Sequence, residues 1–463
     1  MCLCSYSICI EGHIVNPYHS DMVSTIRIIF RNTFTYGVVT IIGRAINYFL
    51  VPLYTCYLSP ASYGVVTEIY SFIAVSSVLF TYSMEVAFFR FTTSINKAMM
   101  FRQFQTLLFC SSTMLSILTI IVLHIMGYSI QHSLLVCGIL IVDTILLIPF
   151  ASLRQDGNLK KFVVLKVSQI LVNVFLNVVF ICFDIFAVDH VTSILLANLL
   201  SNATALAFLK VCVPMSINRD EVRRVLSFCS PLTIMGMFGI ANDMWLRMSL
   251  RYLLPNNFYD GISNENIIGI VGANYKIGAL MSLFVQTFKY AADPILLKLN
   301  NTNSIQSLRR GVMHYFVMSS CVVWLFIDIF KGLICSMFLR RGIYHIGLKI
   351  VPIIAFNYLL YGIYYNLSMS IKVANKNLYL SVFSIICFVV TVMFSVMLIP
   401  YYGYTGGVVA NSISYLMLVV LTYVESQKIF YINYNKADIV SLSIILIIMV
   451  YECVAPPIVI VLY

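Results

Sequence analysis

The sequence predicts an all-α, polytopic membrane protein with about 13 (12–14) transmembrane helices in two pseudo-symmetric six-helix bundles. Three observations predict this fold class: the composition, a series of long apolar segments, and the distribution of basic residues. Of the 463 residues, 60% are hydrophobic and 10% are charged, and the mean hydropathy is +0.93. Soluble domains carry about 25% charged residues. The composition therefore excludes a soluble globule.

Apolar segments long enough to cross a bilayer follow one another from Thr33 onward. A transmembrane helix needs about 20 predominantly apolar residues. Pro456 and Pro457 lie in the last segment, which is expected to be kinked or only partly inserted. The expected spans are 33–57, 64–89, 104–126, 133–153, 162–183, 191–212, 228–253, 266–290, 311–330, 347–371, 378–399, 405–427 and 438–462.

Basic residues gather in alternate loops, which predicts the orientation. With the N-terminus inside, nineteen of the 29 Lys and Arg residues fall in inside segments, three fall in outside loops and seven fall within spans. Cytoplasmic loops of membrane proteins carry the excess of Lys and Arg, so the N-terminus is expected in the cytoplasm. The net charge of +11 then reflects topology, and we expect no nucleic-acid partner.

The first residues lack both the basic start and the apolar core of a signal peptide. Met22 is followed by basic residues that suit the entry of the first span, so translation is expected to start there. Peptides from residues 1–21 in the mature protein would contradict this. The expected organisation is a cytoplasmic segment at 1–32, an N-terminal bundle at 33–225, a C-terminal bundle at 226–430 and an additional transmembrane helix at 431–463.

A weak internal repeat supports the division into two bundles. Gly64 and Tyr70 at the start of the second span have the same spacing as Gly269 and Tyr275 in the eighth. The longest basic inside linker, 210–224, lies at the midpoint. Transporters are often built from two such halves, related by an axis along the membrane normal.

Ionisable residues within the spans predict a functional cavity. An arginine at bilayer depth costs about 2.5–3.5 kcal/mol on insertion scales, so Arg44, in mid-span, is expected to face protein or water. Asp243, Arg247 and Arg251 are spaced four residues apart and should lie on one face of the seventh span. Lys276 lies near the centre of the eighth span. A net positive cleft between the two bundles is therefore expected.

Structural roles are the alternative for several of these groups. Asp243 and Arg247 would then simply neutralise each other, and Arg251 and Lys289 would reach the membrane interface. Asp143 would be a satisfied interior carboxyl group.

Enzymatic motifs are absent from the sequence. It contains no glycine-rich phosphate loop ending in Lys-Ser or Lys-Thr and no metal-like spacing of His or of the 13 Cys. No outside loop is long enough to hold an active site. We therefore expect no enzyme activity, no cofactor, no metal and no ATP motor.

Several segments resemble a known family. Near the N-terminus these are Tyr36-Gly37, the run at 52–54 (PLY), LSPASYG at 58–64 and MEVAFFRF at 84–91. Later segments are FKYAADP at 288–294, YGIYYNLS at 361–368 and IPYYGYTGG at 399–407. Over about residues 24–435 the chain resembles bacterial polysaccharide-biosynthesis membrane proteins of the O-antigen flippase type. These belong to the multidrug/oligosaccharidyl-lipid/polysaccharide (MOP) exporter superfamily.

The resemblance implies two six-helix bundles in a V that opens alternately to either side of the bacterial inner membrane. It also implies movement of an undecaprenyl-diphosphate-linked oligosaccharide, a repeat unit of O-antigen, capsule or exopolysaccharide. A polysaccharide polymerase and a chain-length regulator are further expected partners. Many family members have a fourteenth span, which this sequence does not provide.

The cationic cavity and the implied substrate fit each other, because guanidinium groups bind phosphate through paired hydrogen bonds. The expected residues fall into three groups. Arg44, Arg247 and Lys276, with Arg251 and Lys289, are expected to bind the diphosphate; Asn47, Asn242 and Asn274 to contact sugar hydroxyls; and Asp243, Glu85 and Asp143 to carry a coupling ion. Two alternatives remain: a cation-coupled multidrug exporter, and a membrane glycan polymerase or acyltransferase.

Overall fold

The computed structural model describes residues 43, 46, 48–92, 97–183, 189–209, 219–297, 302–374 and 376–454. Arg44 and Asn47, two residues of the predicted cavity, lie outside the described residues, as do residues 1–42 and both prolines of the last predicted span.

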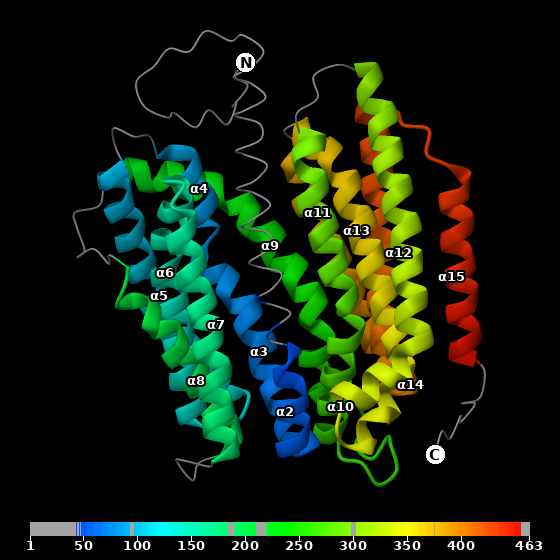
Figure 1. Ribbon diagram of the computed structural model, residues 1–463, viewed down its shortest axis with the longest axis horizontal. Helices are drawn as coiled ribbons and strands as arrows, with labels where there is room; N and C mark the ends of the chain where they lie inside the picture. Colours follow the sequence, from blue (N-terminus) through cyan, green and yellow to red (C-terminus); the bar gives the residue numbers. More distant parts are fainter. Residues whose placement is uncertain are drawn as a thin grey trace.

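The first group of helices occupies the left of Figure 1 and reaches its centre, where α2 lies. It comprises α2 (Leu50–Tyr57), α3 (Pro60–Thr81), α4 (Met84–Phe91), α5 (Lys97–Ile125), α6 (Ile130–Gln155), α7 (Leu159–Cys182) and α8 (His190–Leu206). The α5 helix packs on α6, and α7 packs on α8. Short connections favour this pairing of sequence neighbours.

The second group lies on the right of Figure 1, with α15 at its edge. It comprises α10 (Asn264–Gly278), α11 (Leu280–Leu297), α12 (Thr302–Phe338), the 3₁₀ helix η1 (Gly342–Ile350), α13 (Val351–Val373), α14 (Asn377–Ile429) and α15 (Lys436–Val454). The long helix α9 (Arg219–Leu253) runs diagonally between the groups, packing on α4 near its start and on α14 along its length.

Nine helices of the described chain are long and apolar enough to cross a membrane. One of them, α14, contains two predicted spans, separated where Gly403 adopts the non-helical angles φ 61° and ψ −143°. The sixth and thirteenth predicted spans correspond to the shorter helices α8 and α15, and α2 is the end of the first. The chain is therefore a multi-pass, all-helical membrane protein, as predicted.

Two predicted spans are interrupted rather than continuous. The second breaks between α3 and α4, where Tyr82 and Ser83 both have positive φ angles. The eighth breaks at Ala279, between α10 and α11. Helix α12 also extends beyond its predicted limits at both ends, and η1 occupies part of the predicted outside loop. Apolar periodicity locates a span but does not fix where its backbone bends.

The two halves meet where α3 packs on α10. Both helices begin with a serine cap: Ser59 accepts a hydrogen bond from the Ser62 amide (3.1 Å), and Ser263 accepts one from the Asn266 amide (3.4 Å). The glycines of the internal repeat face each other, because a Cβ atom added at Gly269 would overlap the Pro60 carbonyl group. The repeat thus brings the two backbones into direct contact.

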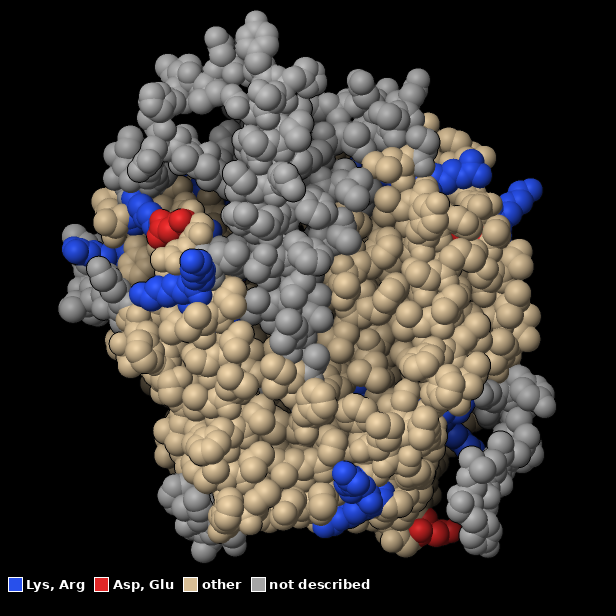
Figure 2. All heavy atoms as spheres, viewed as in Figure 1, with Lys and Arg blue, Asp and Glu red and all other residues tan. Residues whose placement is uncertain are grey.

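The outer surface suits a lipid environment. On the face drawn in Figure 2, a broad band of uncharged side chains crosses the molecule, and Lys and Arg lie mainly above and below it. Large apolar side chains are exposed on the outer helices, including Ile117 of α5 (65%) and Ile329 of α12 (71%). Lipid tails would cover these side chains.

Candidate functional site

The centre of the candidate site is an ion pair on α9. Asp243 and Arg247 are one helical turn apart, and the Arg247 Nη2 atom lies 3.5 Å from Asp243 Oδ2. The spacing of four residues predicted that both would lie on one face. The side chains are 19% and 11% exposed, so both groups are largely removed from solvent. Ionisable groups held inside a membrane protein are costly and usually functional.

Two tyrosines from other helices complete the cluster. The Tyr275 hydroxyl on α10 donates a hydrogen bond to Asp243 Oδ1 (2.6 Å). The Tyr358 hydroxyl on α13 donates to both carboxylate oxygens, at 3.1 and 3.2 Å. The Arg247 guanidinium also lies over the Tyr275 ring, 4.1 Å from its centroid. Three helices thus position one carboxylate.

This arrangement leaves Arg247 with unused donors. Asp243 takes hydrogen bonds from two tyrosine hydroxyls, so its negative charge is shared among several partners. The Arg247 Nε atom is buried and has no hydrogen-bond partner among the described residues. A guanidinium group has five N–H donors and binds phosphate through two of them at once. Arg247 is therefore equipped to receive an anionic oxygen.

The cluster lies at the junction of the two halves. Helix α3 of the first group packs both on α9, which carries Asp243 and Arg247, and on α10, which carries Tyr275. Lys276 follows Tyr275 directly and is exposed. It lines a cavity of about 10 Å³ together with Tyr48 and other residues of α2, α10, α11 and α12. A second cation is thus available beside the cluster.

Arg251 lies one turn further along α9 and is held by acidic groups from both halves. Its guanidinium lies 3.7 Å from Glu68 on α3 and 3.8 Å from Glu265 on α10. The Tyr128 hydroxyl donates a hydrogen bond to the same Glu68 carboxylate (2.9 Å). These contacts join the halves at the end where α3 meets α10 through glycine.

The predicted sugar contacts differ in their surroundings. Asn242 is buried between α9 and α14, where it hydrogen-bonds Ser414 (3.1 Å) and Thr391. Asn274 is fully buried and donates to the Tyr344 carbonyl (2.7 Å). Asn274 also packs closely on Gly347, where a Cβ atom would overlap the amide group.

We expect Asn274→Ala to lower stability without affecting substrate binding. The substitution removes the hydrogen bond from Asn274 to the Tyr344 carbonyl, and hydrogen bonds between helices in membranes contribute about 0.6–1.7 kcal/mol. The melting temperature of the purified protein in detergent should fall by a few degrees. This shift corresponds to a loss of unfolding free energy of about the size given above. An unchanged melting temperature with lost substrate binding would instead place Asn274 in contact with the substrate.

The remaining predicted residues lie apart from the cluster. Lys289 on α11 lies over the Tyr365 ring, 4.2 Å from its centroid. Glu85 on α4 forms an ion pair with Arg154 on α6. Asp143 on α6 accepts a hydrogen bond from Asn202 on α8 (2.8 Å). Among the predicted residues that the structure describes, Asp243 and Arg247 thus form the cluster, Lys276 follows its member Tyr275, and Arg251 lies one turn further along α9.

Comparison with solved structures identifies the fold. The chain is similar to an inward-facing multidrug resistance MATE transporter of the MOP superfamily, with 14% identity over 83% of this chain and 94% of that one (TM-score 0.64). It is also similar to the lipid II flippase MurJ in an inward closed conformation, with 13% identity over 91% and 93% of the two chains (TM-score 0.61). The chain has the MOP-transporter fold.

An outward-facing MATE transporter shares the MOP-transporter fold at 13% identity, over 86% of this chain and 95% of that one, with a TM-score of 0.59. No protein-family model and no curated protein matches the sequence. The predicted helical, multi-pass architecture is thereby confirmed at the level of the MOP-transporter fold.

Sequence reasoning missed Tyr275 and Tyr358 as partners of Asp243. The chain has 30 tyrosines, and most tyrosines of membrane proteins lie at the membrane interface. The residue type alone therefore does not indicate which tyrosine belongs to the site. For Tyr275 a signal existed, since it belongs to the internal repeat. For Tyr358 there was none, because its position opposite Asp243 depends on how α13 packs against α9 and α10.

Proposed function

We propose that this protein is a flippase that moves a diphosphate-linked glycolipid, an undecaprenyl-diphosphate-linked oligosaccharide, across the bacterial inner membrane. The observation that carries the proposal is Arg247 at the junction of the two halves, a largely buried guanidinium whose Nε atom has no hydrogen-bond partner in the described part of the chain. A lipid diphosphate cannot cross hydrocarbon without compensation of its charge. Arg247 and the adjacent Lys276 would supply that compensation.

The proposed binding mode keeps the lipid tail in the bilayer and the charged group at the junction. Lys276 lies beside α2 and α12, and the outer face of α12 is apolar, with Ile329 71% exposed. In this mode the space beside Lys276, about 10 Å³ in the state described here, would have to widen before a headgroup reaches Arg247, while the lipid tail stays outside the bundles. Arg44, outside the described residues, is proposed as the cation contributed by the first half.

Alternating access follows from the contact between α3 and α10. Arg251, Glu68 and Glu265 close one end, which the distribution of basic residues assigns to the outside. The state described here is then inward-facing. Translocation would require these ion pairs and the contact between Gly64 and Gly269 to separate, exposing the headgroup site to the other side.

The energy source is proposed to be the membrane potential or an ion gradient, because the sequence contains no phosphate loop. Asp243 is the best-placed carboxylate to carry a proton or cation, since it lies beside Arg247 and would sense bound anion directly. Asp143 and Glu85 are further candidates within the first half. A polysaccharide polymerase and a chain-length regulator are proposed as downstream partners, which would receive the flipped repeat unit.

Translocation by purified protein in proteoliposomes tests the proposal. Vesicles should move a fluorescent undecaprenyl-diphosphate glycan between leaflets at least tenfold faster than protein-free vesicles. A cationic dye added to the same vesicles distinguishes the alternative, a cation-coupled multidrug exporter. Transport of the dye without movement of the glycan would contradict the flippase, and formation of polymerised or acylated glycan would indicate an enzyme.

A further inference from the structure

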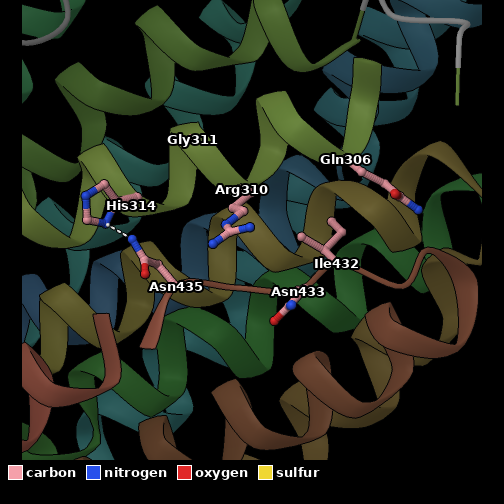
Figure 3. Close-up of a pocket in the computed structure, with 7 residues that line it drawn as sticks. All are labelled: Gln306, Arg310, Gly311, His314, Ile432, Asn433 and Asn435. Carbon is pink, nitrogen blue, oxygen red and sulfur yellow. Dashed lines mark hydrogen bonds between the residues drawn. The ribbon is translucent and has the colours of Figure 1, made fainter. Parts of the chain in front are cut away.

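A second polar pocket lies away from the junction, at the end of the molecule where α12 begins. Its volume is about 420 Å³, within the range of small-molecule sites of about 300–1,000 Å³. It lies between the first turns of α12 and the segment that joins α14 to α15 (Figure 3). The lining residues are Gln306, Arg310, Gly311, His314, Ile432, Asn433 and Asn435.

The walls of the pocket are held in place by partly buried hydrogen bonds and an ion pair. The Gln427 side chain accepts a hydrogen bond from the Ile432 amide (2.9 Å) and donates one to the Ile432 carbonyl (2.8 Å). Asp438 is 5% exposed, and its Oδ1 atom lies 2.6 Å from His314 Nδ1. These contacts fasten the joining segment to α14 and α15 to α12. The pocket is thus built before any ligand arrives.

The chemistry of the lining suits a phosphate group. Figure 3 shows Arg310 between His314 and Asn435 on one side and Gln306 and Asn433 on the other. One guanidinium and three amide side chains offer N–H donors, and none of the lining residues is acidic. Neighbouring Arg309 does not compete for the same ligand, because it is buried and donates to Ser370 (2.9 Å).

The position of the pocket suits a lipid headgroup. Apolar and aromatic side chains beside it are exposed: Tyr315 (73%), Tyr431 (72%) and Ile439 (64%). Tyrosines of this kind lie at the level of lipid headgroups in membrane proteins. The loop distribution of basic residues assigns this end to the cytoplasmic side, where basic pockets between helices bind anionic headgroups.

We propose that this pocket binds the phosphate headgroup of an anionic phospholipid of the cytoplasmic leaflet. The site is separate from the junction of the two halves, and it would clamp the peripheral helix α15 against α12 whatever substrate the junction carries. Arg310 is the group that recognises the phosphate, and the three amides orient it.

Native mass spectrometry of the full-length protein, titrated with phosphatidylglycerol and with phosphatidylcholine, tests the site. We expect one phosphatidylglycerol to bind about tenfold more tightly than phosphatidylcholine, because the choline cation of phosphatidylcholine cancels the charge of its phosphate and would lie near the Arg310 guanidinium, whereas phosphatidylglycerol keeps a net negative charge. Arg310→Gln should remove this preference. Gly311→Leu should remove it while leaving the charge unchanged, because a Cβ atom at Gly311 meets nothing within 4 Å and the added side chain would fill the pocket.

Arg102→Gln is the matched control, because Arg102 is an exposed arginine near the start of α5, at the same predicted side of the membrane. It should keep the full preference. Added glycerol phosphate identifies the source of the phosphate: failure to displace the lipid supports a headgroup anchored by its chains, whereas full displacement supports a site for free phosphate. Equal loss in Arg102→Gln, or a preference retained in both pocket variants, would overturn the proposal.

Discussion

Replacing Arg247 with glutamine is expected to lower the affinity for an undecaprenyl-diphosphate glycan by about tenfold to a hundredfold. The reason is the loss of charge-assisted hydrogen bonds worth about 1.5–3 kcal/mol. Translocation in proteoliposomes should fall to the level of empty vesicles, because a diphosphate without a cationic partner must cross the low-dielectric interior. Binding is measured by titration of labelled lipid into purified protein.

A double variant separates this role from a purely structural ion pair. Arg247→Gln alone leaves Asp243 without its cation, although both tyrosine hydroxyls still donate to it. Asp243→Asn combined with Arg247→Gln removes both charges and so relieves any imbalance. If Arg247 binds the diphosphate, the double variant should fold normally and still fail to bind. Full recovery of binding in the double variant would assign the pair a structural role only.

The second large effect is expected at the contact between the two halves. A Cβ atom at Gly269 would overlap the Pro60 carbonyl, so Gly269→Leu should prevent α3 and α10 from closing. The protein should then remain open at the predicted outside end, and translocation should fall at least tenfold. A cysteine placed at Thr67, which is buried on α3, should become reactive towards an impermeant maleimide added from outside.

Gly239→Leu provides the control for this prediction. Gly239 lies in α9, and a Cβ atom there meets nothing within 4 Å, so the added side chain has room. In a background lacking native cysteines, this variant should leave the Thr67→Cys residue unreactive and translocation intact. Labelling that is equal in both glycine variants would show that the contact between α3 and α10 does not govern access.

The fold class followed from the sequence because its causes are local. Long apolar segments must form helices in a bilayer, where every backbone polar group needs a partner within its own segment. The start of α3 could also be predicted from the sequence, because Ser59 caps the helix and Pro60 occupies its first turn. The interruption at Ala279, by contrast, keeps the backbone in the right-handed helical region and was not predicted.

The site was predictable only along a single helix. The spacing of Asp243 and Arg247 placed them on one face, and they form an ion pair. Their partners Tyr275 and Tyr358 come from other helices, and the register between helices depends on packing that no short pattern encodes. The same limit applies to Arg251. The sequence places it one helical turn after Arg247, but it does not reveal the ion pairs with Glu68 and Glu265.

Restoration of surface polysaccharide tests the central claim most directly. The intact chain, Arg44→Ala and Arg247→Gln would be expressed at matched membrane levels in a bacterial strain that makes a compatible lipid-linked repeat unit but lacks its own flippase. If the cationic junction carries a diphosphate, we expect the intact chain to restore surface glycan and both variants to fail. Restoration by both variants at the level of the intact chain would contradict it.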